Sequence, residues 1–177
     1  MVVDLPDIGP EHMRIWIKFL YTGRIFTGTE TPQIRQSEAE LFCKDVSAWN
    51  RLYTLGDFLQ DGDFKDALID AMMEFTAILN AYPIRLPDFI YSHSTKDSAH
   101  RRFVVDMFVN VRNDKTFETN LGYSQEFLYD MLKSIVPSLG KGIELQFSED
   151  WFKSQDGCKY HDHGDKPCYK KKPAFRF

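Results

Sequence analysis

Two cysteines and two histidines lie close together near the carboxyl end of this 177-residue chain, and their types suit metal binding. They are Cys158, His161, His163 and Cys168, spaced as C-x2-H-x-H-x4-C within eleven positions. Thiolate and imidazole are ligands that tetrahedral zinc prefers, and two of each supply the four that a structural site requires. Glycines and a proline around them allow the chain to bend.

Two interpretations of this segment remain open. In the first, His161 and His163 lie two apart on extended chain and point the same way, and a bound zinc ion stabilises a tail with little core of its own. In the second, the tail is polar and partly disordered, and its histidines are incidental. The spacing departs from the common zinc-finger patterns, so metal analysis of the purified protein has to distinguish the two.

Other reactive residue types lie near position 95, but their spacing does not predict an enzyme. The segment contains the residue types of a hydrolase triad: His93, Ser94, Asp97, Ser98 and His100. No nucleophile elbow precedes them, and serine and aspartate commonly cap helices. We therefore predict no catalytic residue and a protein that is not an enzyme.

Composition predicts a soluble, folded, intracellular protein, nuclear or cytoplasmic. Hydrophobic residues make up 43% of the chain, enough for a buried core, and the formal charge of -4 does not favour nucleic acid or an acidic membrane surface. The first residues, MVVDLPDIG, do not resemble a secretory signal, and no run approaches the roughly 20 apolar residues that span a bilayer. Three cysteines are too few for a disulfide framework, which fits a reducing compartment.

The elements that must position these residues are mostly helices, and the clearest is a helical hairpin over residues 49–79. Its first arm has Leu52, Leu55 and Leu59 at helical spacing, and its second arm repeats the pattern from Phe64 onward. We expect Gly62 to adopt a positive φ that ends the first helix, and Asp63 to cap the second.

Amphipathic patterns predict further helices before and after the hairpin. A helix from Pro10 to about Tyr21 should end at Gly23, with its buried face formed by Met13, Trp16, Ile17 and Leu20. A helix over residues 99–110 should begin after the cap Asp97 or Ser98, and a later helix should begin after the cap Ser124 and end at residues 137–142. Their apolar stripes are Phe103, Val104, Met107 and Phe108 in the first, and Phe127, Leu128, Met131, Leu132 and Ile135 in the second. Short β-strands are expected at residues 2–5 and 24–27.

Two motifs in the first half of the chain give a family resemblance. The helix ending in FLYTG (residues 19–23) is followed by LYTLGDFLQ (residues 52–60) and FKDA (residues 64–67). Together they resemble the carboxyl-terminal half of a fungal-type BTB/POZ domain, over residues 2–79. Residues 90–109 look like the helical extension that follows the domain in those proteins, and the amino-terminal half of the domain is missing.

The resemblance and the helical patterns together imply a mainly α fold with an α+β remnant: a truncated BTB/POZ helical core and an appended helical region. The cysteine and histidine residues add a candidate zinc-binding tail. We divide the chain into a partial BTB/POZ domain (1–82), a helical extension (83–147) and a polar tail containing cysteine and histidine (148–177).

The resemblance also implies a protein–protein interaction module, acting as a scaffold or ubiquitin-ligase adaptor, whose partner is another BTB chain or an unknown protein. Residues implied for partner binding are Trp16, Phe19, Tyr21, Tyr53 and Phe58. Cullin-binding members carry a hydrophobic-x-Glu motif after the FLYTG helix, but residues 34–36 read Ile-Arg-Gln, which argues against cullin. The alternative is a zinc-stabilised, nucleic-acid-contacting or transcription-associated protein, with the lysines at 170–172 on phosphate. Neither interpretation predicts a membrane partner.

Overall fold

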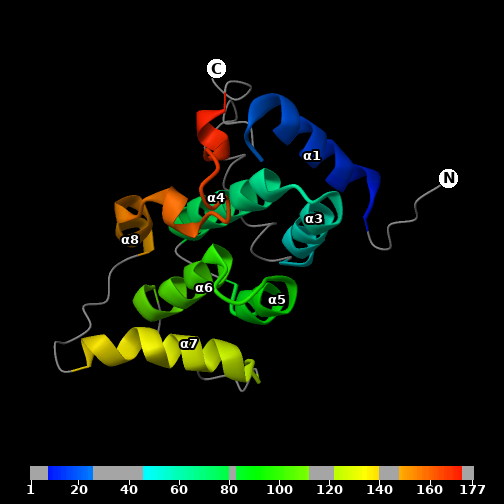
Figure 1. Cartoon of the computed structure of the whole chain (residues 1–177). Helices are drawn as coiled ribbons and strands as arrows, with labels where there is room; N and C mark the ends of the chain where they lie inside the picture. Colours follow the sequence, from blue (N-terminus) through cyan, green and yellow to red (C-terminus); the bar gives the residue numbers. More distant parts are fainter. Residues whose placement is uncertain (1–7, 26–45, 80–82, 112–121, 140–147, 173–177) are drawn as a thin grey trace. The chain divides into compact units, whose positions relative to one another are not determined.

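A computed structural model of the chain describes residues 8–25, 46–79, 83–111, 122–139 and 148–172 (Figure 1). Its α-helices are α1 (Pro10–Thr22), α3 (Val46–Leu59), α4 (Gly62–Leu79), α5 (Leu86–His93), α6 (Ala99–Asn110), α7 (Gln125–Ile135) and α8 (Ser148–Ser154). Short 3-10 helices are η2 (Val136–Ser138), η3 (Gly157–Tyr160) and η4 (Tyr169–Lys171). None of the described residues forms a β-strand, which confirms the mainly helical prediction.

The two expected strands have different outcomes. Residues 2–5 lie outside the described residues, as do residues 34–36, where the cullin motif was sought. At the second strand, only Arg24 and Ile25 are described, and neither is extended in a sheet. The Arg24 N–H instead donates to Thr22 Oγ1 at 3.2 Å, so the chain leaves α1 through a local turn.

The chain forms two compact units. Unit 1 consists of residues 1–75 and 163–177, and unit 2 consists of residues 76–162. In no described part of the chain is a helix both long and apolar enough to cross a bilayer.

The core of unit 1 is built on the predicted hairpin, which α3 and α4 form. The predicted stripe of the second arm, from Phe64 through Leu68 and Met72, is buried. Trp49 on α3 is also buried, and its indole N–H donates to the Leu68 carbonyl of α4 at 3.1 Å. The rings of Trp49 and Tyr53 stack with their centroids 5.1 Å apart. The first arm of the hairpin therefore contributes aromatic packing in addition to its leucine side chains.

The hairpin turn differs from the prediction in two residues. Gln60 adopts the positive φ (54°) that was expected of Gly62, and Gly62 is already the first residue of α4. Asp61 caps α4 in place of Asp63, because its Oδ1 accepts the Phe64 N–H at 3.0 Å. The other oxygen of the Asp61 carboxylate accepts the Trp16 indole N–H at 2.9 Å. This tertiary contact holds the Asp61 side chain in place, which favours Asp61 over Asp63 as the cap of α4.

Helix α1 begins at Pro10 and ends at Gly23 (φ 65°) as predicted, but its predicted buried face is wrong. His12 and Phe19 are the buried residues, whereas Ile17 and Leu20 are 44% and 42% exposed. Phe19 packs on Phe64 with ring centroids 5.3 Å apart. The apolar residues of α1 cover more than one face, so sequence periodicity did not fix which side packs.

Unit 2 is organised around α6, which packs against α5 and α7. The predicted stripe of α6 is buried, and Ser98 caps the helix as expected, with its Oγ accepting the His100 N–H at 3.1 Å. The prediction for α7 is half confirmed: Ser124 caps it, and Phe127 and Met131 are buried. Leu132, a member of the same predicted stripe, is 58% exposed.

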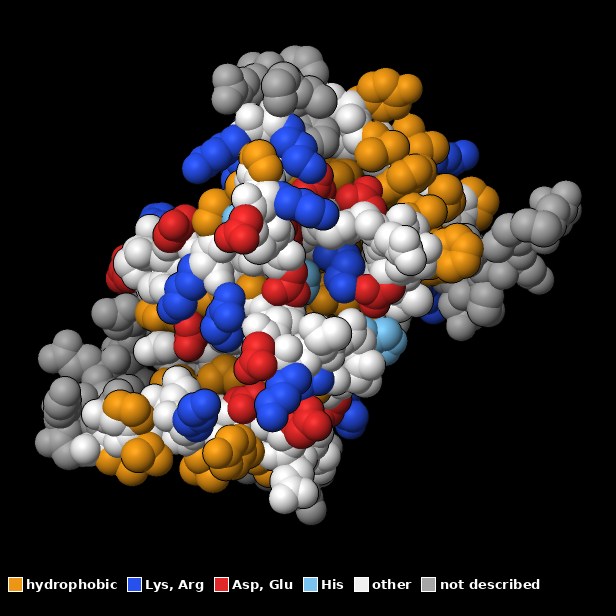
Figure 2. All heavy atoms as spheres, viewed as in Figure 1, with side chains coloured by type: hydrophobic (Ala, Val, Ile, Leu, Met, Phe, Trp, Pro, Cys, Tyr) orange, Lys and Arg blue, Asp and Glu red, His pale blue; other side chains and the backbone are white. Residues whose placement is uncertain are grey.

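On the face shown in Figure 2, hydrophobic side chains gather over α1 and over α7, with acidic and basic side chains interspersed elsewhere. The exposed large hydrophobic residues of the α7 region are Leu128, Tyr129, Leu132, Val136 and Leu139.

Candidate metal centre

The four candidate ligands belong to one continuous stretch, residues 158–168, which we call the ligand stretch. It begins within η3, whose amino end is capped by Asp156 through the Cys158 N–H at 3.0 Å. Aspartate at this position satisfies an N–H that a short helix leaves unpaired. Cys158 is therefore held on a closed turn and is half-buried.

Tyr160 anchors the start of the ligand stretch on α6. Its side chain is fully buried, with its ring 5.4 Å from that of Phe103 and its hydroxyl donating to Asp106 Oδ2 at 3.2 Å. Burial, followed by the nearby Asp106 carboxylate, raises the pKa of Tyr160 well above its ordinary value. Lys159 adds an ion pair to the same carboxylate oxygen at 2.7 Å. The residue before His161 is thus fixed by packing and by charge.

The end of the ligand stretch continues into η4, which is anchored on α4. Cys168 is buried and immediately precedes η4. The hydroxyl of Tyr169 donates to Asp70, and Lys170 Nζ lies 2.8 Å from Asp70 Oδ2. Burial and the Asp70 charge raise the pKa of Tyr169 above its ordinary value, so its hydroxyl stays protonated as a donor.

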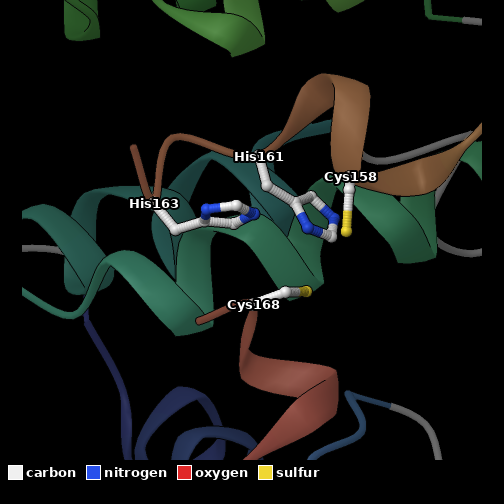
Figure 3. Close-up of side chains that lie close together, drawn as sticks. All are labelled: Cys158, His161, His163 and Cys168. Atoms are coloured by element: carbon white, nitrogen blue, oxygen red, sulfur yellow. The ribbon is translucent and has the colours of Figure 1, made fainter. Parts of the chain in front are cut away.

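Between these ends, the chain reverses so that all four ligand side chains turn toward a common centre (Figure 3). One ligand atom from each residue can be chosen so that all four lie within 4.8 Å of one another. In a filled tetrahedral zinc site, with Zn–S of about 2.3 Å and Zn–N of about 2.0–2.1 Å, these atoms lie about 3.3–3.8 Å apart. The ligand atoms therefore need to close by about 1.0–1.5 Å at most to hold a zinc ion.

The hydrogen bond of His163 fixes which of its nitrogens faces the cluster. Its Nδ1 lies 2.9 Å from the Gly164 carbonyl oxygen. A carbonyl oxygen can only accept, so Nδ1 carries the proton and Nε2 carries the lone pair. Gly164 allows this geometry with a φ of 56°. A backbone carbonyl on the far nitrogen is the usual outer partner of a zinc-bound histidine.

The donor set determines what this cluster can do. Two thiolates and two imidazoles suit zinc, and their summed charge of -2 neutralises a divalent ion. Four protein ligands complete a tetrahedron and leave no position for water or substrate, which is the arrangement of structural sites rather than catalytic ones. The structure confirms that the four residues singled out in the sequence come together.

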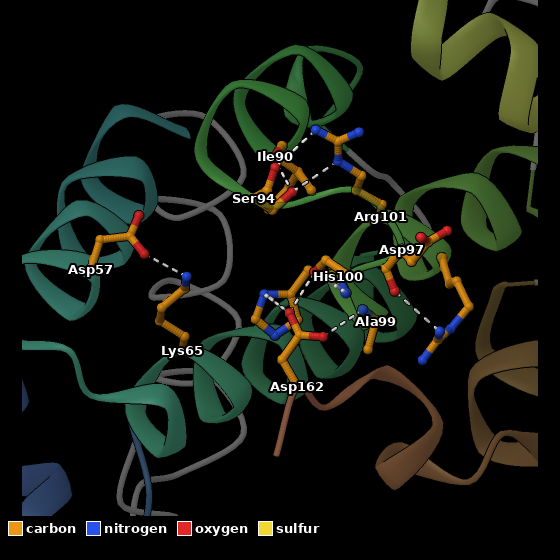
Figure 4. A network of polar contacts seen from close by, with 11 residues as sticks. Asp57, Lys65, Ile90, Ser94, Asp97, Ala99, His100, Arg101 and Asp162 are labelled. Atoms are coloured by element: carbon orange, nitrogen blue, oxygen red, sulfur yellow. Dashed lines mark hydrogen bonds and ion pairs between the residues drawn. The ribbon is translucent and has the colours of Figure 1, made fainter. Parts of the chain in front are cut away.

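Sequence reasoning missed Asp162, which lies between the two histidines. Its carboxylate accepts the Ala99 N–H at 2.5 Å and the Ser98 hydroxyl, both at the start of α6 (Figure 4). Nothing in the sequence near Asp162 indicates a partner more than 60 positions earlier. The H-D-H pattern and the predicted cap at Ser98 were both visible, but only the fold joins them.

The residue types of a hydrolase triad are not arranged as one. The Ser98 hydroxyl donates to Asp162 rather than to a histidine, and Ser98 is buried. His100 Nδ1 lies 3.7 Å from Asp162, and His93 stacks on Phe89 of its own helix. A triad needs the histidine between serine and carboxylate, so this arrangement supplies no activated nucleophile.

The residues implied for partner binding divide into two groups. Phe19 and Tyr53 are buried in the core of unit 1, and Trp16 is half-buried with its indole bonded to Asp61. Tyr21 and Phe58 are exposed. Phe19 and Tyr53 pack in the core of unit 1, so of these residues Tyr21 and Phe58 are the ones exposed enough to contact a partner.

Unit 2 also contains a surface pocket of about 390 Å³, lined by residues of α5, α6 and α7. At least three of the seven charged side chains that line it are engaged within the protein, and the lining mixes both signs of charge. Arg101 binds Glu126, Asp106 binds Lys159, and Asp130 accepts the Tyr91 hydroxyl at 2.8 Å. The pocket therefore carries no clear preference for a ligand.

Comparisons with protein-family models, curated proteins and solved structures find no match to this chain, and nothing in them identifies a BTB/POZ domain.

Proposed function

We propose that the ligand stretch binds one zinc ion as a structural centre in a protein that is not an enzyme. The observation that carries the proposal is the convergence of two cysteines and two histidines within 4.8 Å, from a segment that spans only eleven positions from the first to the last. A closed four-ligand set stabilises a fold and leaves no reaction site.

The experiment is metal analysis of protein purified without added metal, combined with thermal unfolding. One zinc per chain, and a melting temperature that falls on chelation and recovers on zinc addition, are the expected results. A Co²⁺-substituted sample should show the intense visible bands of tetrahedral thiolate coordination. No bound zinc together with unchanged melting after chelation would refute the centre.

The function of the zinc-stabilised protein is proposed to be association with another protein, as the BTB/POZ resemblance implies. Support comes from α7, where Leu128, Leu132 and Val136 follow each other at intervals of four and are exposed. A contiguous exposed apolar face is characteristic of a protein interface.

The partner proposed for this face is a second copy of the chain. Glu126 and Lys133 lie seven positions apart, on the same flank of the apolar face of α7. In an antiparallel pair of α7 helices, Lys133 of one copy lies near Glu126 of the other. The Glu126 side chain pairs with Arg101 of its own chain but is 71% exposed, so it can also provide charge complementarity across the two-fold axis.

Size-exclusion chromatography with light scattering tests this association. Leu132→Asp should convert a dimer to a monomer, because it places a charge at the centre of the apolar face. Ile17→Asp is the matched control, since Ile17 is a similarly exposed apolar residue on α1. A wild-type monomer at all accessible concentrations, or equal effects of the two substitutions, would refute the assignment to α7.

The alternative, a zinc-dependent contact with nucleic acid, has less support. Lys170 forms its ion pair with Asp70, and Lys172 forms one with Asp63, so two of the three tail lysines have carboxylate partners within the protein. A salt-dependent gel shift that disappears in a Cys158→Ser, Cys168→Ser variant would favour this alternative over the interaction module.

A further inference from the structure

We propose that Asp162 is a positioning residue of the metal centre, which ties the backbone between the two histidine ligands to the start of α6. The inference rests on the zinc centre proposed above. It concerns a residue that is not itself a ligand, and it predicts how metal binding and the amino end of α6 influence each other.

The contacts of Asp162 begin with the unpaired N–H groups at the start of α6. A helix leaves its first N–H groups without partners inside the helix, and each needs an external acceptor. The Ser98 Oγ accepts from His100, and the Asp162 Oδ1 accepts from Ala99 at 2.5 Å. The capping of α6 is therefore shared between its own cap residue and a carboxylate from the ligand stretch.

The Ser98 hydroxyl connects the two groups that cap α6, its own oxygen and the Asp162 carboxylate. It accepts from the backbone of His100 and donates its own proton to Asp162, so both of its hydrogen-bonding roles are used. Ser98 and His100 are both buried, and His100 Nδ1 lies 3.7 Å from Asp162 Oδ2. A carboxylate in this position is held by two donors and by the positive end of the α6 dipole.

The location of Asp162 in the sequence makes this attachment important for the ligands. His161 and His163 are its two neighbours, so fixing Asp162 restricts the backbone dihedral angles that aim both imidazoles. Tyr160 restrains the preceding residue through Asp106 of the same helix. Without the Asp162 attachment, the histidines would have to be ordered at the moment of binding, which weakens metal affinity.

Metal affinity is the quantity that tests the inference, measured by competition with a chromophoric chelator. Asp162→Ala should weaken zinc binding about tenfold, in the range found for groups that orient ligands. Asp162→Asn should restore most of the affinity, because its carbonyl oxygen can still accept from Ala99. Asp165→Ala is the matched control: it removes an exposed carboxylate from the same stretch and should leave the affinity unchanged.

Hydrogen exchange provides a second readout, which does not depend on the affinity values. Zinc should slow exchange of the amides in the first turn of α6 in the wild-type protein, and this effect should be lost in Asp162→Ala, since coupling between two sites is reciprocal. If Asp162→Ala folds poorly, Ser98→Ala tests the same attachment from the other side and should also weaken zinc binding.

The outcomes separate this inference from the zinc centre itself. A wild-type protein that binds no zinc overturns both. A wild-type protein that binds zinc, with Asp162→Ala matching the affinity of Asp165→Ala, overturns only the positioning role. Weakened binding in Asp162→Ala and recovery in Asp162→Asn support it.

Discussion

Replacement of Arg101 by methionine tests how unit 2 is held together. Arg101 lies on α6 and is buried, and Figure 4 shows its guanidinium beside Ser94 at the end of α5. The guanidinium also reaches α7. One terminal nitrogen donates to the carbonyls of Tyr91 and Ser94, at the carboxyl end of α5, at 2.9 and 2.8 Å. The other donates to Glu126 of α7 at 2.7 Å.

The structure allows these contributions to be ranked. The Glu126 side chain is 71% exposed, so its ion pair is screened by water and contributes at most about 1 kcal/mol. The two carbonyls are end groups of α5, and each accepts a charge-assisted hydrogen bond worth about 1.5–3 kcal/mol. The guanidinium also lies 4.4 Å from the centroid of the Tyr91 ring. Methionine preserves much of the stem packing but none of the donors, so we expect a loss of about 3–6 kcal/mol from the two carbonyl contacts.

Urea unfolding and amide hydrogen exchange of α5 peptides measure this loss. Arg101→Met should lower the free energy of unfolding of unit 2 and accelerate exchange in α5, whereas Glu126→Gln should cost no more than about 1 kcal/mol. Equal losses in the two variants would show that the ion pair, not the carbonyl contacts, carries the stabilisation. An unchanged Arg101→Met variant would refute the role of Arg101 altogether.

Three further predictions follow from other contacts. Cys168→Ser should weaken zinc binding at least about 100-fold in chelator competition, because each of four ligands carries roughly a quarter of the 10–16 kcal/mol typical of structural zinc; unchanged affinity would exclude Cys168 as a ligand. The raised pKa values of Tyr160 and Tyr169 stabilise the folded state fully below about pH 10 and progressively less above it, since only the unfolded chain then loses these protons. Tyrosinate absorbance should therefore show both groups titrating only together with unfolding, and their titration in the folded protein would contradict their burial. Trp49→Phe should destabilise unit 1 by about 1–2 kcal/mol in urea unfolding, because the hydrogen bond to Leu68 and part of the ring packing are lost. An unchanged free energy of unfolding would show that the contact of Trp49 with Leu68 does not stabilise the hairpin.

Local signals predicted much of the helical architecture. Pro10 and Gly23 marked the ends of α1, and Ser98 and Ser124 marked the starts of α6 and α7. Caps act over three or four residues, so the sequence contains all the information they need. The hairpin turn was predicted to within two residues, and it differed because Asp61 also binds Trp16, a contact that no local pattern reveals.

Which face of a helix is buried depends on its neighbours. Both α1 and α7 carry apolar residues over more than half of their circumference, and the sequence pattern selected Ile17 and Leu132 as buried. The structure exposes both residues. Phe19, which lies outside the predicted face of α1, is buried, and on α7 Phe127 and Met131 are the members of the predicted stripe that are buried. Periodicity defines a stripe well only when the remaining positions are polar.

The sequence by itself determined the chemistry of the candidate metal centre. Two cysteines and two histidines within eleven positions specify both the donor types and, since the segment is short, their capacity to converge. The tertiary structure decided how they are held. Tyr160 and Asp162 bind α6, and Tyr169 binds α4, through partners that lie at least 50 positions away in the sequence. Such contacts depend on how the helices pack, and packing is a property of the whole fold that spacing along the chain does not encode.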